Sequence, residues 1–145
     1  MKSTLKKNTF LGLLLLAAAT MIGAAEVKIE KYKGGDWEDA IGYRQAVRVG
    51  QMLYISGSAA GGEMPDAIRG SYDYLEKTLK AHGLTFKNVV KENIYTTNLD
   101  ALKANQSVRR AYYGKDFPAA TWVQVVRLYN PEQVIEVELI AVFPE

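Results

Sequence analysis

The chain has 145 residues, no cysteine, one histidine and a formal net charge of +2 at neutral pH. The lack of cysteine excludes disulfides, thiol nucleophiles and cysteine-bound metals. No phosphate-binding loop, dinucleotide fingerprint or HExxH metal motif occurs, so we expect no cofactor and no metal.

Residues 1–25 have the three parts of a secretory signal peptide. Three lysines precede an apolar run over residues 10–22, and small residues follow before Glu26. The run is shorter than the roughly 20 residues of a membrane-spanning helix, so we expect no stable membrane insertion after the signal is removed. The sequence therefore predicts an exported protein of the bacterial periplasm with one mature domain, residues 26–145. That domain carries 15 basic and 16 acidic residues, a net charge of −1, which argues against nucleic acid as a partner.

The mature domain begins with a strand-rich portion. Residues 27–32 alternate apolar and charged side chains and predict a short edge strand, followed by a loop or single turn over residues 37–40. The runs 43–49 and 52–56 flank a Gly-Gln pair and predict a β-hairpin. The glycines of residues 57–62 predict a loop that can approach a ligand or a neighbouring subunit closely.

Two helices are predicted next along the chain. The first begins at Pro65 and ends at Gly83, with apolar residues at spacings of four, three and four. His82 lies in its last turn and has no evident base or metal partner, so we interpret it as a structural or surface residue. The second helix is expected to be capped by Asp100 and to run to about Tyr113.

A third long strand, 89–97, separates the two helices, and a final hairpin is predicted from the runs 121–128 and 134–142 around an Asn-Pro turn. This order predicts an α+β fold in which two helices cover one face of a mixed sheet. The other face has no helix to cover it. We therefore expect a second copy of the chain to cover it in an oligomer.

Glu136 and Glu138 are two residues apart in the last run, so a strand points both carboxylates to one face. Two interpretations follow from this spacing. The carboxylates lie on a solvated face, as alternating charge usually does. Alternatively, one of them lines a cleft where partial burial raises its pKa and suits it to proton transfer.

Several short motifs resemble the RidA family of reactive-intermediate or imine deaminases, also called the YjgF superfamily. The likeness runs from about Ile41 to Phe143 and is carried by Gly42-Tyr43, Val49-Gly50-Gln51-Met52, Ser56-Gly57, Asn88-Val89-Val90-Lys91, Phe117-Pro118-Ala119 and Val134-Ile135-Glu136-Val137-Glu138 with Ala141. The resemblance implies a chorismate-mutase-like fold and a compact homotrimer. It also implies that small carboxylates bind in clefts between the subunits.

The same resemblance suggests roles for individual residues. Glu136 matches a cleft glutamate that positions the attacking water and is the candidate catalytic residue, while Glu138 stays with the solvated interpretation. Tyr43 matches a cleft tyrosine, or alternatively packs at the subunit interface, and Ser56 lies at the loop-facing strand end. Ala120 stands where the family's deaminases carry an arginine that binds the substrate carboxylate. Thr121 either donates a hydrogen bond to a ligand or is an ordinary strand residue.

The missing arginine leaves two functions open. One is hydrolysis of an imine-type small molecule, with another cation in place of the arginine; the candidates are Arg44, Arg48, Arg110 and Arg127. The other is a non-catalytic trimer that binds a small ligand or holds another protein. Ribonuclease activity, which some family names mention, is disfavoured by the mature charge and by export.

Overall fold

The computed structural model describes residues 26–145, so the predicted signal peptide lies outside the described residues. The elements in chain order are β1 (Ile29–Tyr32), α1 (Trp37–Ile41), β2 (Ala46–Val49), β3 (Met52–Gly61), α2 (Met64–Ala81), the 3-10 turn η1 (Phe86–Asn88), β4 (Val89–Thr96), α3 (Leu99–Ala104), α4 (Gln106–Tyr113), β5 (Ala119–Gln124) and β6 (Gln133–Val142). Within this part of the chain, no helix has the length and apolar character needed to cross a membrane.

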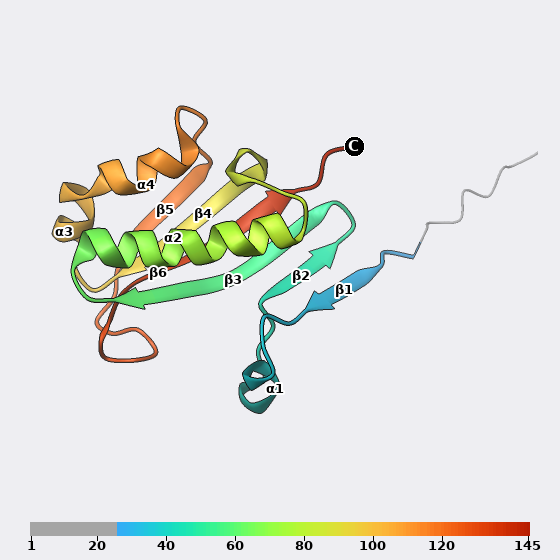
Figure 1. Ribbon diagram of the computed structural model, residues 1–145, viewed down its shortest axis with the longest axis horizontal. Coiled ribbons are helices and arrows are strands. Elements are labelled where there is room, and N and C mark those ends of the chain that lie inside the picture. Colours follow the sequence, from blue (N-terminus) through green and yellow to red (C-terminus); the bar gives the residue numbers. More distant parts are fainter. Residues whose placement is uncertain (1–25) are drawn as a thin grey trace, which may run out of the picture.

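The six strands form one mixed sheet in the order β1-β2-β3-β6-β4-β5. All neighbouring strands are antiparallel except β4 and β5, which run parallel. Figure 1 shows α2, α3 and α4 together on one side of this sheet, with α1 apart from them. The predicted α+β fold with helices on one face of a mixed sheet is confirmed.

The last two strands do not form the predicted hairpin. β5 pairs with β4 in parallel at the sheet edge, whereas β6 lies between β3 and β4 and pairs antiparallel with both. The alternate residues of β6 that face the helices are almost completely buried, which suits a central strand. The connecting residues 125–132 leave β5 and pass the end of β4, where Val125 donates a backbone hydrogen bond to Thr96.

The glycine-rich segment after Ser56 is also not the predicted loop. β3 continues through it to Gly61, with a shift in register against β6 between Ile55 and Ser58. Such a shift is the signature of a β-bulge, which bends a strand and re-aims its side chains. The glycines here serve close approach within a strand.

The helices follow the predicted pattern with two corrections at the second one. α2 has Pro65 in its first turn, and Gly83, with φ of +71°, follows its C-terminal residues. The cap of α3 is Asn98, whose side chain accepts the backbone N–H of Ala101 at 2.9 Å, and not Asp100. Asn105 then ends α3 and separates it from α4, so the predicted single helix is two.

The hydrophobic core lies between the helices and the sheet. The predicted stripe on α2 is completely buried against the inward side chains of β6; its members are Ile68, Tyr72, Leu75 and Leu79. His82 packs edge-on against Tyr32, with ring centroids 4.3 Å apart, and burial lowers its pKa. That contact fits a structural residue.

The sheet face away from α2 carries an apolar row in this chain. Val47, Tyr54 and Ile140 are aligned across β2, β3 and β6, and Tyr54 is 45% exposed. No helix of the described residues has extensive contacts with this side. We refer to it below as the open face of the sheet.

Candidate functional site

Glu136 lies on the open face near the start of β6, two residues before Glu138 on the same face. Burial raises the pKa of the Glu136 carboxyl, and the negative charge of Glu138 raises it further. Among residues 26–145, no side chain or backbone group donates a hydrogen bond to Glu136, and no cation pairs with it. Its carboxylate is therefore half-buried and free to accept a proton.

Gly57, in the bulge of β3, makes room for that carboxylate. A Cβ added at Gly57 would lie 2.8 Å from both Cγ and Cδ of Glu136 and closer still to Oε1. These separations are far below van der Waals contact. A side chain at position 57 would therefore displace the Glu136 carboxylate from its place over the backbone.

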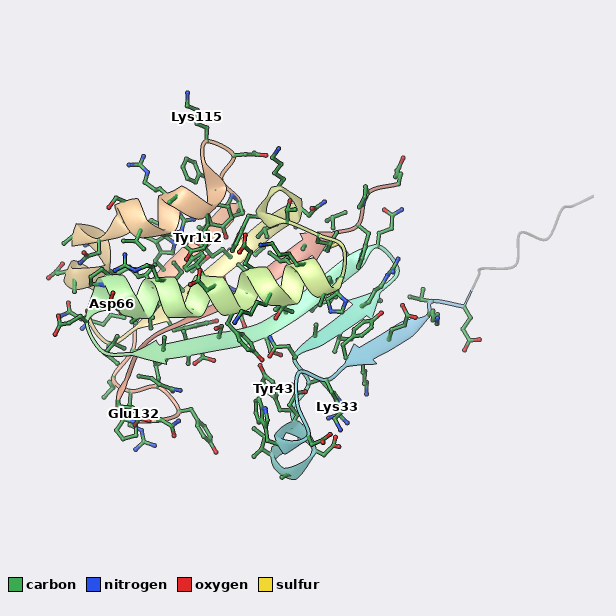
Figure 2. The ribbon with its side chains drawn as sticks, in the orientation of Figure 1. Lys33, Tyr43, Asp66, Tyr112, Lys115 and Glu132 are labelled. Atoms are coloured by element: carbon green, nitrogen blue, oxygen red, sulfur yellow. The ribbon has the colours of Figure 1, made fainter. Side chains whose placement is uncertain are left out.

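Tyr43 contacts the backbone of the same glycine. Its hydroxyl donates to the Gly57 carbonyl at 3.3 Å, and its ring stacks on Trp37 of α1 at 5.3 Å. Figure 2 shows Tyr43 between α1 and the sheet. Burial raises the pKa of Tyr43, and the charge of Glu136 contributes to that rise. Tyr43, Gly57 and Glu136 thus form one cluster.

Ser56 lies next to this cluster but faces a neighbouring depression. Its hydroxyl donates to the Arg44 carbonyl at 2.7 Å, which commits its proton to the backbone. The depression has a volume of about 210 Å³, and Lys91, Asn93 and Glu138 also line it. Ser56 can therefore offer a ligand a lone pair more readily than a proton.

Glu138 is not simply solvated, which corrects that interpretation. Its Oε1 accepts from the Asn93 side-chain amide at 2.6 Å and from the Tyr95 hydroxyl at 3.2 Å. Sequence reasoning missed Asn93 and Tyr95 as site residues. Their two-residue spacing on β4 was a usable signal, but it has meaning only once β4 is known to lie beside β6.

Ala120 and Thr121 lie on the edge strand β5, separated from Glu136 by β4. Ala120 is in register with Glu92, whose side chain is buried on the helix-covered side, so Ala120 points away from the open face. The Thr121 hydroxyl accepts from Lys91 Nζ at 2.7 Å. A single chain therefore does not bring these two residues to Glu136.

The four arginines considered as replacement cations lie in different surroundings. Arg44 pairs with Asp39 at 2.8 Å, and Arg48 and Arg110 lie over phenylalanine rings. Arg127 instead lines an open pocket of about 440 Å³ together with Glu136 and Glu138. Arg127 therefore shares a pocket with the candidate catalytic carboxylate.

Behind β5, the helix-covered side holds a buried polar network that sequence reasoning missed. Glu92, completely buried, accepts Arg109 Nε and Nη2 at 2.7 Å each. The hydroxyls of Tyr72 and Tyr113 donate to its other oxygen, Oε2. Trp122 Nε1 donates at 3.3 Å to Oε1, the oxygen that Arg109 also contacts. This network ties α2, α4, β4 and β5 together.

Among residues 26–145, no cluster of His, Cys, Asp and Glu suits a metal ion.

The family model described as endoribonuclease L-PSP matches residues 37–143. The chain belongs to this family, the RidA or YjgF superfamily. The matched range includes Tyr43, Gly57, Arg127 and Glu136. The predicted family membership is thereby confirmed.

Relatives of this RidA-family chain include a goat (Capra hircus) 2-iminobutanoate/2-iminopropanoate deaminase. It is 34% identical over 113 residues, which cover 71% of this chain and 82% of the relative. A RutC family protein from Pyrococcus horikoshii is 29% identical over 109 residues, which cover 68% and 85%. A YjgF-family crystal structure from Mycobacterium tuberculosis matches with a TM-score of 0.73 and 27% identity, covering 80% of this chain and all of that one. The RidA-like fold is thus shown as well.

Proposed function

We propose that this RidA-family protein is exported and binds a small metabolite in clefts between the subunits of a homotrimer, where it hydrolyses a C=N bond. The observation that carries the proposal is the Glu136 carboxylate, which is half-buried, unpaired within the described residues and of raised pKa. General bases in enzymes have this combination of access and pKa. The goat relative named as a deaminase of 2-imino acids supports the choice of an imine.

In the proposed reaction, water adds to the imine carbon while Glu136 takes one of its protons. Glu136 returns that proton to the nitrogen, which gives a carbinolamine. Glu136 then takes the proton of the new hydroxyl group and passes it to the nitrogen as the C=O bond forms and the C–N bond breaks, so that ammonia and a carbonyl product leave. The Tyr43 hydroxyl and the Gly57 backbone form the wall beside the reacting carbon. Glu138, which Asn93 and Tyr95 hold in place, keeps the pKa of Glu136 raised by its charge.

The proposed trimer follows from the apolar row on the open face, which has no cover within the described chain. Association would bury this row, and burial of apolar surface contributes roughly 25 cal/mol per Å². The proposed assembly also brings the edge strand β5 of one subunit beside Glu136 of the next, with Thr121 on the open face and Ala120 pointing away from it. The site would then be complete only in the assembly.

A non-catalytic binding or protein-holding module is the second candidate. The hydroxyl protons of Tyr43 and Ser56 are already donated to backbone carbonyls, so neither is available to activate a substrate. This favours a cleft that binds a ligand without converting it. The name of the family model suggests ribonuclease activity as well. A mature net charge of −1 gives no electrostatic case for RNA binding, so we do not propose it.

The test is release of ammonia from 2-iminobutanoate formed in situ, with the parent and three variants. Glu136→Gln removes the base, Glu132→Gln makes the same change on an exposed residue of the loop before β6 (Figure 2), and Ala120→Arg supplies the family's cation. Turnover that survives Glu132→Gln and is lost in Glu136→Gln is expected. Activity of Ala120→Arg alone would mean that the cleft serves another ligand, and silence of all four would favour the binding module.

Export has its own test. In bacterial cells that produce the full chain, we expect the protein in the periplasmic fraction with Glu26 as its first residue, as a cleaved signal peptide requires. Protein with an intact N-terminus in the cytoplasmic fraction would refute export, and this result would not bear on the proposed role of Glu136.

A further inference from the structure

The pocket that Glu136 shares with Arg127 contains two carboxylates and one guanidinium. Its polar lining consists of Tyr95, Arg127, Tyr129, Glu136 and Glu138, and its volume is about 440 Å³. That volume lies within the range of roughly 300 to 1,000 Å³ that holds small ligands. The pocket is therefore large enough for a small metabolite that carries charge.

The guanidinium of Arg127 is kept apart from both carboxylates. Among residues 26–145, Arg127 makes no ion pair, and its Nε donates to the backbone carbonyl of Leu128 at 3.3 Å. Leu128 is buried, so this hydrogen bond ties the guanidinium to a fixed part of the loop. The two terminal nitrogens remain available, and these form the planar fork that binds a carboxylate through two hydrogen bonds.

The other arginines have different partners. Arg109 is locked to Glu92, Arg69 pairs with Asp66 at 2.6 Å, and Arg44 pairs with Asp39. Arg110 also makes no ion pair among the described residues, but it lies over the Phe117 ring and does not line this pocket. Arg127 is thus distinguished by its place beside two carboxylates. A cation and a free carboxylate that line one pocket without pairing are complementary to a molecule that carries both charges.

We propose that Arg127 is the carboxylate-binding residue of this site and that its ligand is a small molecule with both a carboxylate and a cationic nitrogen. Arg127 holds the carboxylate, and Glu136 and Glu138 face the nitrogen end. This inference rests on the proposed function, since it uses the same pocket. Arg127, in the loop before β6, would then replace the arginine that the family's deaminases carry at the position of Ala120.

The experiment measures equilibrium binding of two probes by titration calorimetry. The first is 2-aminobutanoate, which carries both charges, and the second is its amide, which keeps the ammonium and loses the carboxylate. The parent is expected to bind the acid at least about 10-fold more tightly than the amide, the usual effect of a charge-assisted hydrogen bond. Arg127→Gln should abolish this preference and Arg127→Lys should restore part of it. Arg69→Gln, the same change on the surface of α2, should leave it intact.

The outcomes separate this inference from the proposed function. Equal binding of acid and amide by the parent, no binding of either, or a preference that survives Arg127→Gln would each overturn the role of Arg127. If the protein turns over 2-iminobutanoate and Arg127→Gln keeps the preference for the acid over the amide, the hydrolase proposal holds but Arg127 is not its carboxylate-binding residue. Binding that depends on Arg127 without any turnover would keep the carboxylate site and refute the hydrolase.

Discussion

The buried network around Glu92 leads to a sharp stability prediction. Replacing Glu92 by leucine removes the only carboxylate of residues 26–145 that Arg109 contacts, and the Arg109 side chain is 5% exposed. A guanidinium cannot lose its proton to escape burial, so it must remain as an unpaired buried charge. Removing one partner of a buried pair costs about 3–5 kcal/mol. The Tyr72 and Tyr113 hydroxyls also lose their acceptor, which adds about 1–3 kcal/mol for each that stays dry.

The reverse change should be milder. In Arg109→Leu the Glu92 carboxylate keeps three hydrogen-bond donors, from Tyr72, Tyr113 and Trp122. Burial raises the pKa of Tyr113, and the charge of Glu92 raises it further, so that hydroxyl stays a donor at any working pH. We therefore expect Arg109→Leu to cost less than Glu92→Leu. The double variant should cost less than the sum of the two.

Urea unfolding at one fixed protein concentration measures these free energies, because the proposed assembly would make stability depend on concentration. The expected loss for Glu92→Leu is at least about 3 kcal/mol, or roughly 10 °C in Tm for a domain of this size. A loss below about 1 kcal/mol, or single effects that simply add, would refute the reasoning. Since Trp122 belongs to the network, a loosened β5 is a further expected consequence.

Three further predictions concern the open face. The raised pKa of Glu136 means that this carboxyl group binds a proton more tightly in the folded protein than in the unfolded chain. Protonation of Glu136 therefore stabilises the fold below the pKa of the group in the unfolded chain, and this stabilisation is lost as the pH rises through its pKa in the folded protein. Glu136→Gln should therefore keep or raise Tm at neutral pH, and the acid limb of the parent's pH–rate profile should lie above the ordinary value of 4.5. Gly57→Ala should displace Glu136 and lower turnover by about 100-fold, whereas Gly70→Ala, whose Cβ meets only a 3.7 Å contact, should not. Tyr54→Glu should yield folded monomers in sedimentation, while Val27→Glu, another exposed position, should leave the assembly mass unchanged.

Local features were predictable from the sequence because they depend on near neighbours. The apolar spacing on α2 identified the buried stripe, and the alternation in the last strand placed Glu136 and Glu138 on one face. The family motifs identified the fold, and the family model confirms the membership. Each of these signals lies within a short segment or a short motif.

Features that depend on strand order could not be predicted in this way. The alternation of β4 points Glu92 inward and Asn93 outward, but the sequence does not reveal that Arg109 meets the first and Glu138 the second. The glycines after Ser56 suggested a loop because glycine is common in loops. Their tight contact with β6 could not be predicted, because β6 lies about 80 residues further along the chain. Long-range pairing decides which polar residues become a site.

The wrong hairpin prediction concerns the segment on which the site depends. A hairpin would have led from one strand directly into its neighbour through a short turn. Because β5 instead runs parallel to β4 and outside it, the chain must return past the end of β4 before it can enter β6. Residues 125–132 make that return, and they carry Arg127 and Tyr129 into the pocket of Glu136. The same crossover that places β6 at the centre of the sheet therefore supplies the cation for its carboxylate.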